Sequence, residues 1–299
     1  MSAFRERCPD TVFADQDASA ALAGGAFFFS GGKMRKTSDI IGQIEKYAPL
    51  FLAASWDKSG IQVASGRREV SCLAVLLDPT PFALQKAMEN GAEMVLSHHP
   101  LTMEPRYLDT LDSYHAAVSL LLRNDVPLYS AHTSLDANLD GPVSWLAGEL
   151  DLVSLVPLEE TAPPLPGGTL PCGFGFCGNL PQPMPYGVFL INLGEVLEVT
   201  RWNACGAVPE TVRRVACCPG SGSSYAQIAF ALGADVLITG DVKYHSALES
   251  PLRMLDVGHF CLEHTMMRLF AEQLAREMPD IAVTFFPSHD PLTPEHGEA

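Results

Sequence analysis

The sequence predicts an α/β fold made of two related lobes with largely parallel or mixed sheets. Two observations predict it: strands and helices alternate along most of the chain, and a nine-residue pattern recurs at an offset of 142 residues. A length of 299 residues allows one large domain or two ordinary ones, and 47% apolar residues suit a sizeable buried core.

The first lobe is expected to begin with a helix that starts at the capping residue Thr37 and ends before Pro49. Strands over 72–77 and 94–96 then flank a helix over 81–90, which makes a βαβ unit with parallel strands. A further helix and strand follow over 114–123 and 128–130.

The second lobe repeats this plan with a strand over 215–218 and a helix over 225–232. Residues 233–241 align with residues 91–99 without a gap, and both segments read Gly-Ala-acid followed by apolar residues. Residues 257–263 likewise echo residues 130–136, since both contain a small residue, a histidine, a leucine and an acid in the same order. We interpret this as a duplication; chance similarity between two βαβ units is the alternative.

Between the repeats, residues 158–185 are rich in Pro and Gly, and the segment 163–168 is expected to be a loop. Strands are expected over 189–193 and 196–200, with a turn at Gly194. We therefore take the region as a surface excursion within the second half. The expected boundaries are 34–137 and 138–290 for the two halves, with a flexible tail over 291–299.

Residues 1–33 differ from the rest. A weak apolar patch over 20–29 is interrupted by glycines and preceded by acids, which argues against a secretory signal. Gly31 and Gly32 match a ribosome-binding sequence read in frame shortly before Met34. We expect translation to begin at Met34 and residues 1–33 to be a disordered extension without function.

Charge and cysteine content narrow the class of protein. There are 35 Asp and Glu residues against 19 Lys and Arg, a net charge of −16, which makes non-specific nucleic-acid binding unlikely and favours cation uptake. The eight cysteines include the adjacent pair Cys217 and Cys218 and form no Cys-x-x-Cys, so we expect a reducing, cytoplasmic setting. No apolar run is long enough to span a membrane, so a soluble protein is expected.

Five of the nine histidines lie at or just after predicted strand ends: His98, His99, His132, His245 and His259. Ligand sites collect at such strand ends in parallel sheets. Imidazole with carboxylate is a ligand set for Zn²⁺, Mn²⁺, Fe²⁺ or Ni²⁺, and a bridging carboxylate can hold two ions.

The spacing of these residues favours a metal site. His98 and His99 are adjacent, so on an extended strand end their side chains point apart and suit two different ions. Two His-acid pairs have helical i, i+4 spacing: His132 with Asp136, and His259 with Glu263. Each pair alone could be a helix-face hydrogen bond, but their joint occurrence at corresponding points of the repeat favours metal ligation.

Other groupings carry weaker signals. Residues 221–224 resemble an anion-binding loop but lack the Lys of a Walker motif. Cys261 is expected to be a buried, inert thiol. Trp56 and Asp57 are expected to pack and cap the turn before a strand over 60–63.

Five segments resemble motifs of the Nif-three-like family, the dinuclear metal-centre proteins often labelled GTP cyclohydrolase 1 type 2 homologues. In order along the chain they are residues 56–63, 97–101, 130–136, 239–245 and 258–263. The resemblance covers residues 34 to about 287 and implies two intertwined α/β lobes. It also implies a toroidal homohexamer.

The resemblance further implies two divalent metal ions per subunit. Their ligands would be His98, His99, Asp136, His259 and Glu263, with Glu263 bridging both ions. His132 and His245 match family positions near the site, and we expect them to orient ligands or transfer protons. The chain departs from the family at Asp241, where Glu is usual.

Two functions follow as hypotheses. The first is a metal-dependent hydrolase of the GTP cyclohydrolase type, acting on a nucleotide or a phosphoester. The alternative is a non-catalytic, metal-binding hexamer that serves as a metal chaperone, store or regulatory partner. The acid excess is consistent with both.

Overall fold

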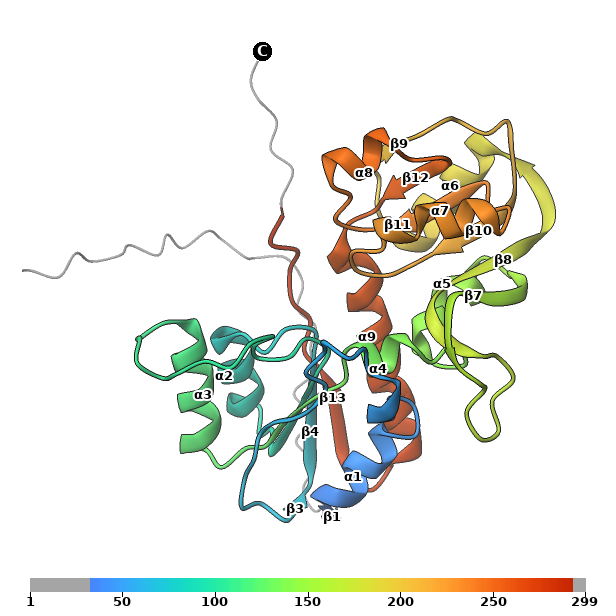
Figure 1. The fold of residues 1–299 in the computed structure, drawn as a ribbon. Coiled ribbons are helices and arrows are strands. Elements are labelled where there is room, and N and C mark those ends of the chain that lie inside the picture. Colours follow the sequence, from blue (N-terminus) through green and yellow to red (C-terminus); the bar gives the residue numbers. More distant parts are fainter. Residues whose placement is uncertain (1–32, 293–299) are drawn as a thin grey trace, which may run out of the picture. The chain divides into compact units, whose positions relative to one another are not determined.

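The computed structural model describes residues 33–292 and, within them, two main sheets and a short ribbon (Figure 1). The ribbon pairs β1 (Arg35–Lys36) with β3 (Glu69–Val70). The expectations for residues 1–32 and for residues 293–299 lie outside the described residues. The α/β class predicted from the sequence is confirmed.

The first sheet has five strands in the order β13-β4-β5-β6-β2. Their bounds are β2 (Gly60–Val63), β4 (Cys72–Leu76), β5 (Met94–Ser97), β6 (Leu128–Ser130) and β13 (Ala282–Phe285). Four strands run parallel, and β2 joins β6 antiparallel at one edge. Because β13 lies beside β4, a strand near the end of the chain completes a sheet begun in the first lobe (Figure 1).

Helices cover both faces of this sheet. On one face lie α2 (Pro81–Glu89) and α3 (Ser113–Arg123), packed on Ala74, Leu76 and Val95 (Figure 1). The other face belongs to a larger core cluster that includes buried residues of α1 (Thr37–Ile44) and α9 (His259–Glu277). Successive strand residues point to opposite faces, and both faces are covered, so β5 is buried throughout and β4 is buried from Leu73 to Leu76.

Local chemistry sets the ends of these helices. The Thr80 hydroxyl accepts a hydrogen bond from the backbone N–H of Ala83, and Pro81 follows in the first turn of α2. Gly91, with φ of +85°, comes directly after its end. Thr37, in contrast, is the first residue of α1 and not its cap, because its hydroxyl donates to the Arg67 carbonyl.

The second sheet has six strands in the order β7-β8-β10-β11-β12-β9. Their bounds are β7 (Val153–Ala162), β8 (Cys172–Pro185), β9 (Asn203–Cys205), β10 (Thr211–Cys217), β11 (Val236–Thr239) and β12 (Arg253–Asp256). The three strands β10, β11 and β12 are parallel neighbours in the same order as β4, β5 and β6. This repeated topology agrees with the predicted duplication.

Two predictions for the region between the repeats are wrong. The segment 186–197 is not a pair of strands but the helix α6 (Tyr186–Leu197), whose buried residues Phe189, Leu193 and Leu197 recur every four positions. Short apolar runs fit either a strand or a helix, and packing on the second sheet decides the matter here.

The Pro- and Gly-rich segment is also more ordered than a surface excursion. The strands β7 and β8 pair antiparallel, and only residues 163–171 form the loop between them. Gly173 permits this pairing, because a Cβ at this position would lie 2.0 Å from the Glu159 carbonyl oxygen. The glycines therefore mark close backbone approach as well as a turn.

The remaining helices are short. They are α4 (Thr133–Asp136), α5 (Trp145–Glu149), α7 (Ala226–Ala231), α8 (Tyr244–Leu248) and the 3₁₀ turns η1 (Leu50–Leu52), η2 (Pro142–Ser144) and η3 (Ser223–Tyr225). Among residues 33–292, no helix has both the length and the apolar character to cross a membrane.

Candidate metal centre

Histidines predicted at strand ends meet in one cluster. His98 and His99 directly follow β5, His132 follows β6 by one residue, and His259 is the first residue of α9. The ring centroid of His99 lies 5.0 Å from that of His98, 5.5 Å from that of His132 and 5.4 Å from that of His259. Three strand ends thus bring together residues that are up to 161 positions apart in the chain.

The buried part of the cluster consists of His98, Asp136 and Glu263. The His98 side chain is fully buried, and its Nε2 lies 3.7 Å from Asp136 Oδ1 and 3.7 Å from Glu263 Oε1. The Nδ1–H of His98 donates to the Ala131 carbonyl at 2.8 Å, which leaves Nε2 with its lone pair facing the two carboxylates.

The more exposed part consists of His99, His259 and the other oxygen of Glu263. Glu263 Oε2 lies 3.1 Å from His99 Nε2 and 2.9 Å from His259 Nε2. The two Nε2 atoms are 3.4 Å apart. His259 and Glu263 are one helical turn apart on α9, as their spacing predicted.

Acidic residues outside the cluster orient three of its histidines. Asp78 Oδ1 lies 2.7 Å from His99 Nδ1, and Asp241 Oδ2 lies 2.7 Å from His259 Nδ1. A carboxylate at Nδ1 holds the proton there and leaves Nε2 as the donor atom that faces the cluster. Asp241 therefore reaches His259 even though it is one methylene shorter than the expected Glu.

The third oriented histidine is His132. Its Nδ1 lies 2.7 Å from Oδ1 of Asp57, whose side chain is fully buried and also accepts hydrogen bonds from Ser59 and Thr133. Burial would raise the pKa of Asp57, but these hydrogen bonds hold it well below its usual range. The carboxylate is thus ionised and fixes the His132 ring.

The electrostatics of the cluster depend on protons when no metal is bound. Burial lowers the pKa of His99, but the bonds to Asp78 and Glu263 outweigh it and raise this pKa to about 10. The hydrogen bond with Glu263 raises the pKa of His259 to about 9, although burial acts in the opposite direction. Burial opposes ionisation of Glu263, yet His98, His259 and His99 hold its pKa well below the ordinary value.

Two glycines allow the backbone to approach the cluster closely. Gly220 has φ of +66°, and a Cβ there would lie 2.7 Å from Glu263 Oε1. Gly240 passes the start of α9 so closely that a Cβ would lie 2.4 Å from the His259 backbone nitrogen. Side chains at these positions would displace Glu263 or His259.

The donor set fits a divalent metal ion. His98 Nε2 and Asp136 Oδ1 are buried without a hydrogen-bond partner, although they face each other. Such atoms cost free energy unless a bound group satisfies them. The donor atoms of His99, His259 and Glu263 lie within 4.8 Å of one another, as do those of His98, His99 and His132. Nitrogen and carboxylate oxygen together suit first-row transition metals and zinc.

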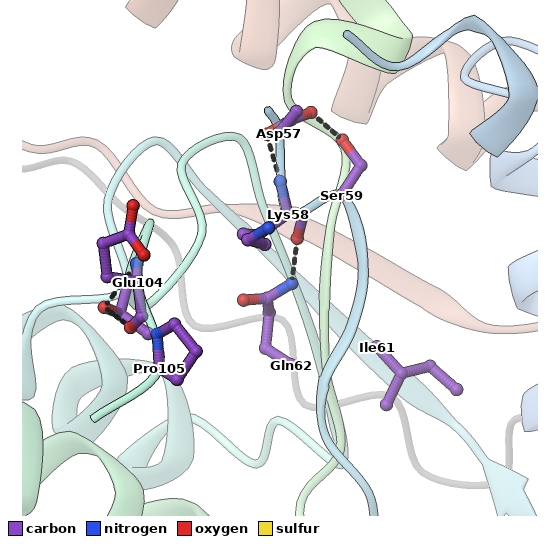
Figure 2. Close-up of a pocket in the computed structure, with 8 residues that line it drawn as sticks. Asp57, Lys58, Ser59, Ile61, Gln62, Glu104 and Pro105 are labelled. Atoms are coloured by element: carbon purple, nitrogen blue, oxygen red, sulfur yellow. Dashed lines mark hydrogen bonds between the residues drawn. The ribbon is translucent and has the colours of Figure 1, made fainter. Parts of the chain in front are cut away.

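A cavity of about 620 Å³ opens beside the cluster. Asp136, His132, His259 and Glu263 contribute to its wall. A smaller hollow of about 380 Å³ is lined by Lys58, Gln62 and Glu104, among others (Figure 2). Asp57 lines this hollow, where Figure 2 shows its bonds to Ser59 and to the Lys58 backbone.

Some predicted site residues are not in the cluster. His245 is exposed in the first turn of α8, and its imidazole ring lies 5.4 Å from the ring of Tyr244, away from the cluster. Cys261, which was predicted to be a buried, inert thiol and not a ligand, is half-buried. Its sulfur donates to the Leu197 carbonyl, at 3.7 Å, and burial raises the pKa of its thiol to about 11. Ser221 of the predicted anion loop lines the cavity.

Sequence reasoning missed the orienting acids. Asp78 was not predicted as a site residue, and Asp57 was predicted only to pack and cap a turn. Asp78 lies shortly after β4, and Asp57 lies shortly before β2. Neither position in the sequence indicates which histidine the acid contacts. The one usable signal was Asp241, which aligns with His99 in the duplicated segment and lies at the equivalent strand end.

Comparisons with known proteins show which family the chain belongs to. The family described as Duf34/NIF3 (NGG1p interacting factor 3) matches residues 35–291. The chain belongs to the Duf34/NIF3 family. A relative named GTP cyclohydrolase 1 type 2 homolog, from Clostridium perfringens, is 30% identical over 263 residues, which is 87% of this chain and 98% of the relative. The predicted family is confirmed.

Solved structures show the Duf34/NIF3 fold as well. A Bacillus cereus protein related to NIF3 has a TM-score of 0.78 at 23% identity, covering 87% of this chain and 99% of that one. Reduced HcgD from Methanocaldococcus jannaschii has a TM-score of 0.73 at 27% identity, covering 85% and 99%.

Proposed function

We propose that the protein binds two divalent metal ions in the cluster and acts as a metal-dependent hydrolase on a small molecule held in the adjoining cavity. One observation carries the proposal: the two oxygens of Glu263 face different donors. Oε1 faces His98, and Oε2 faces His99 and His259. A carboxylate placed in this way can bridge two ions.

The donors divide between the two ions. His98, Asp136 and one oxygen of Glu263 would hold the buried ion, since Nε2 and Oδ1 there lack hydrogen bonds. His99, His259 and the other oxygen of Glu263 would hold the second. When bound, two such ions polarise a substrate and lower the pKa of a shared water.

The chain itself supplies a group for proton transfer. The Nδ1–H of His132 donates to Asp57, so its Nε2 carries a lone pair at the edge of the cavity. An imidazole held in one orientation by a buried carboxylate can take a proton from an attacking water and return it to a leaving group. His245, which is exposed and outside the cluster, has support only from the family resemblance.

Metal content tests the bridging role of Glu263. The purified protein loaded with Zn²⁺ or Mn²⁺ should hold two equivalents by elemental analysis, and Glu263→Ala should hold less than one, with its circular dichroism spectrum unchanged. Glu272→Ala, on the exposed side of the same helix, is the matched control and should retain both. Two equivalents in Glu263→Ala would refute the bridge.

A substrate screen tests the hydrolase proposal. Protein reconstituted with Zn²⁺, Mn²⁺ or Fe²⁺ is incubated with GTP, the substrate that the names of relatives suggest, and with nucleosides and phosphoesters. Formate release from a purine, or phosphate release from an ester, would support the proposal, and His132→Gln should lower turnover without loss of metal. No turnover with any metal while two equivalents are bound would contradict it.

A metal chaperone or store is the second candidate. It is favoured by the exposure of one end of the cluster, where the His259 side chain is 34% accessible and that of Asp241 is 47% accessible. An ion there can exchange with a partner or with solvent, and the net charge of −16 attracts cations. Rapid exchange of one equivalent with a chelator, together with no turnover, would support this function over hydrolysis.

A further inference from the structure

The cavity beside the cluster has an aromatic lining. Its aromatic side chains are Phe51, Trp56, Phe174 and Tyr225. Trp56 is 59% exposed and its ring lies 6.0 Å from that of His132, so it stands at the mouth of the cavity next to the proposed proton-transfer group. Exposed aromatic faces beside a polar cluster are suited to stacking on a flat ring.

The charges in this lining are mostly negative. Three carboxylates contribute to it, those of Asp136, Glu159 and Glu263, and none of the described residues that line it is a Lys or Arg. Lys58, close to Trp56 in sequence, lines the smaller hollow instead (Figure 2). Among the described lining residues, positive charge can therefore come only from the histidines, and bound metal ions would add to it. A single anionic group could bind there, but a longer phosphate chain would meet no Lys or Arg among these lining residues.

Glu159 is the acid in the lining that the metal site does not use. It lies on β7, and the Tyr225 hydroxyl donates a hydrogen bond to its carboxylate. Burial and this bond raise the pKa of Tyr225, so the hydroxyl stays protonated and holds the carboxylate in place. Glu159 thus presents a fixed negative charge to the cavity.

We propose that the cavity binds a neutral or cationic planar heteroaromatic compound without a polyphosphate, and that Glu159 excludes polyanions such as nucleoside triphosphates. The ring lies against Trp56 and its neighbours, and a carboxylate at Glu159 repels additional phosphates. This inference rests on the proposed function for its site, and it names the substrate class.

Calorimetry with a matched set of probes tests the proposal. Guanosine is neutral, 7-methylguanosine has a cationic purine, and GTP carries the same base with three phosphates. Both nucleosides should bind more tightly than GTP, by at least about two- to fivefold, because Glu159 is exposed and one unfavourable charge pair at an exposed carboxylate is worth about a factor of two to five. The titrations use metal-loaded and metal-free protein, since GTP itself binds divalent ions.

Two variants isolate the role of Glu159. Glu159→Gln keeps an acceptor for Tyr225 but removes the charge, so it should strengthen GTP binding by about two- to fivefold and weaken 7-methylguanosine binding. Glu160→Gln is the matched control, because it makes the same charge change at the next position, which is exposed like Glu159 but does not line the cavity. It should leave all three affinities unchanged. Trp56→Ala should weaken the binding of both nucleosides.

The outcomes separate this inference from the proposed function. Tighter binding of GTP than of guanosine by the wild-type protein, or no binding of either nucleoside, would overturn the inference. Metal content is measured on the same samples. Nucleoside binding without two metal equivalents would support the inference and reject the dinuclear site. Two metal equivalents together with tighter binding of GTP than of guanosine would support the dinuclear site and reject the inference.

Discussion

At the scale of single residues, the cluster combines burial with charge. Glu263 is 3% exposed and accepts contacts from three imidazoles, His98, His99 and His259. Each imidazole has its other nitrogen engaged, with a carbonyl or a carboxylate. Protons take the place of metal ions in this arrangement, because an uncompensated buried carboxylate is costly.

Metal binding should therefore release protons. The pKa of His99 is raised to about 10 and that of His259 to about 9, so both rings are protonated at pH 7 in the metal-free protein. An imidazole must lose its added proton before it can bind a metal ion, so loading at pH 7 should release at least the two protons held by His99 and His259. Titration calorimetry in buffers of different ionisation enthalpy measures this number.

The direction of the pH dependence follows from the same shifts. Raised histidine pKa values stabilise the metal-free fold below the ordinary pKa of histidine, and this contribution is lost as pH rises through about 9 to 10. Metal affinity should rise over the same range. His259→Gln should release about one proton fewer than the wild type, and His115→Gln, on α3, should not differ from it. Equal heats in all buffers would contradict the protonated state.

At the scale of elements, loops after parallel strands build the site. The loop after β10 places Gly220 against the side-chain carboxylate of Glu263. The loop after β12 passes through Gly258 and leads into α9. The loops after β5 and β6 carry the other histidines. Both sheets thus contribute the carboxyl ends of their strands, which is where open α/β sheets bind ligands.

Gly220→Ala tests the close approach of this loop. The backbone there has φ of +66°, which costs a residue with a Cβ about 1–2 kcal/mol, and the added atom would crowd Glu263 Oε1. We expect a lower melting temperature and a loss of bound metal. Gly187→Ala, in α6, is the control, because no other atom lies within 4 Å of a Cβ added there. The alanine should stabilise the helix by about 0.5–1 kcal/mol. Full metal content in Gly220→Ala would show that Glu263 tolerates the contact.

A second comparison distinguishes the observed α6 from a strand. Phe189 and Ile191 would lie on one face of a strand, but in the helix Phe189 is fully buried and Ile191 is 63% exposed. Phe189→Ala should lower the free energy of unfolding by about 3–5 kcal/mol, and Ile191→Ala by less than about 1 kcal/mol. Urea unfolding measures both values. Similar losses for the two variants would favour the strand.

At the scale of the whole molecule, the negative net charge of each chain opposes the predicted assembly of several chains. The family resemblance implies a ring of six subunits, although each chain carries a net charge of −16. Light scattering coupled to size-exclusion chromatography should therefore give a mass six times the 32.2 kDa of one chain. The measurement is repeated at high salt, which screens repulsion between chains. A mass of one or two chains under both conditions would contradict the hexamer.

Much of the fold could be predicted because its signals are local. The bounds of α2 depend on Thr80, Pro81 and Gly91, which act within a few residues. The helix α6 and the β7–β8 hairpin were misjudged because their sequences fit more than one structure. Contacts with the second sheet decide which of these structures forms, and such contacts cannot be recognised in a short segment of the sequence.

By itself, the sequence determined the residue types of the site and their positions at strand ends. Adjacent His98 and His99, and the i, i+4 pair His259 and Glu263, follow from periodicity along single elements. Only the tertiary structure decided which atoms face one another. The pairs Asp78 with His99 and Asp57 with His132 join residues 21 and 75 positions apart. The pairing of strands within a sheet brings these residues together in space, because it places the ends of separate strands side by side. No local sequence pattern predicts which strands pair.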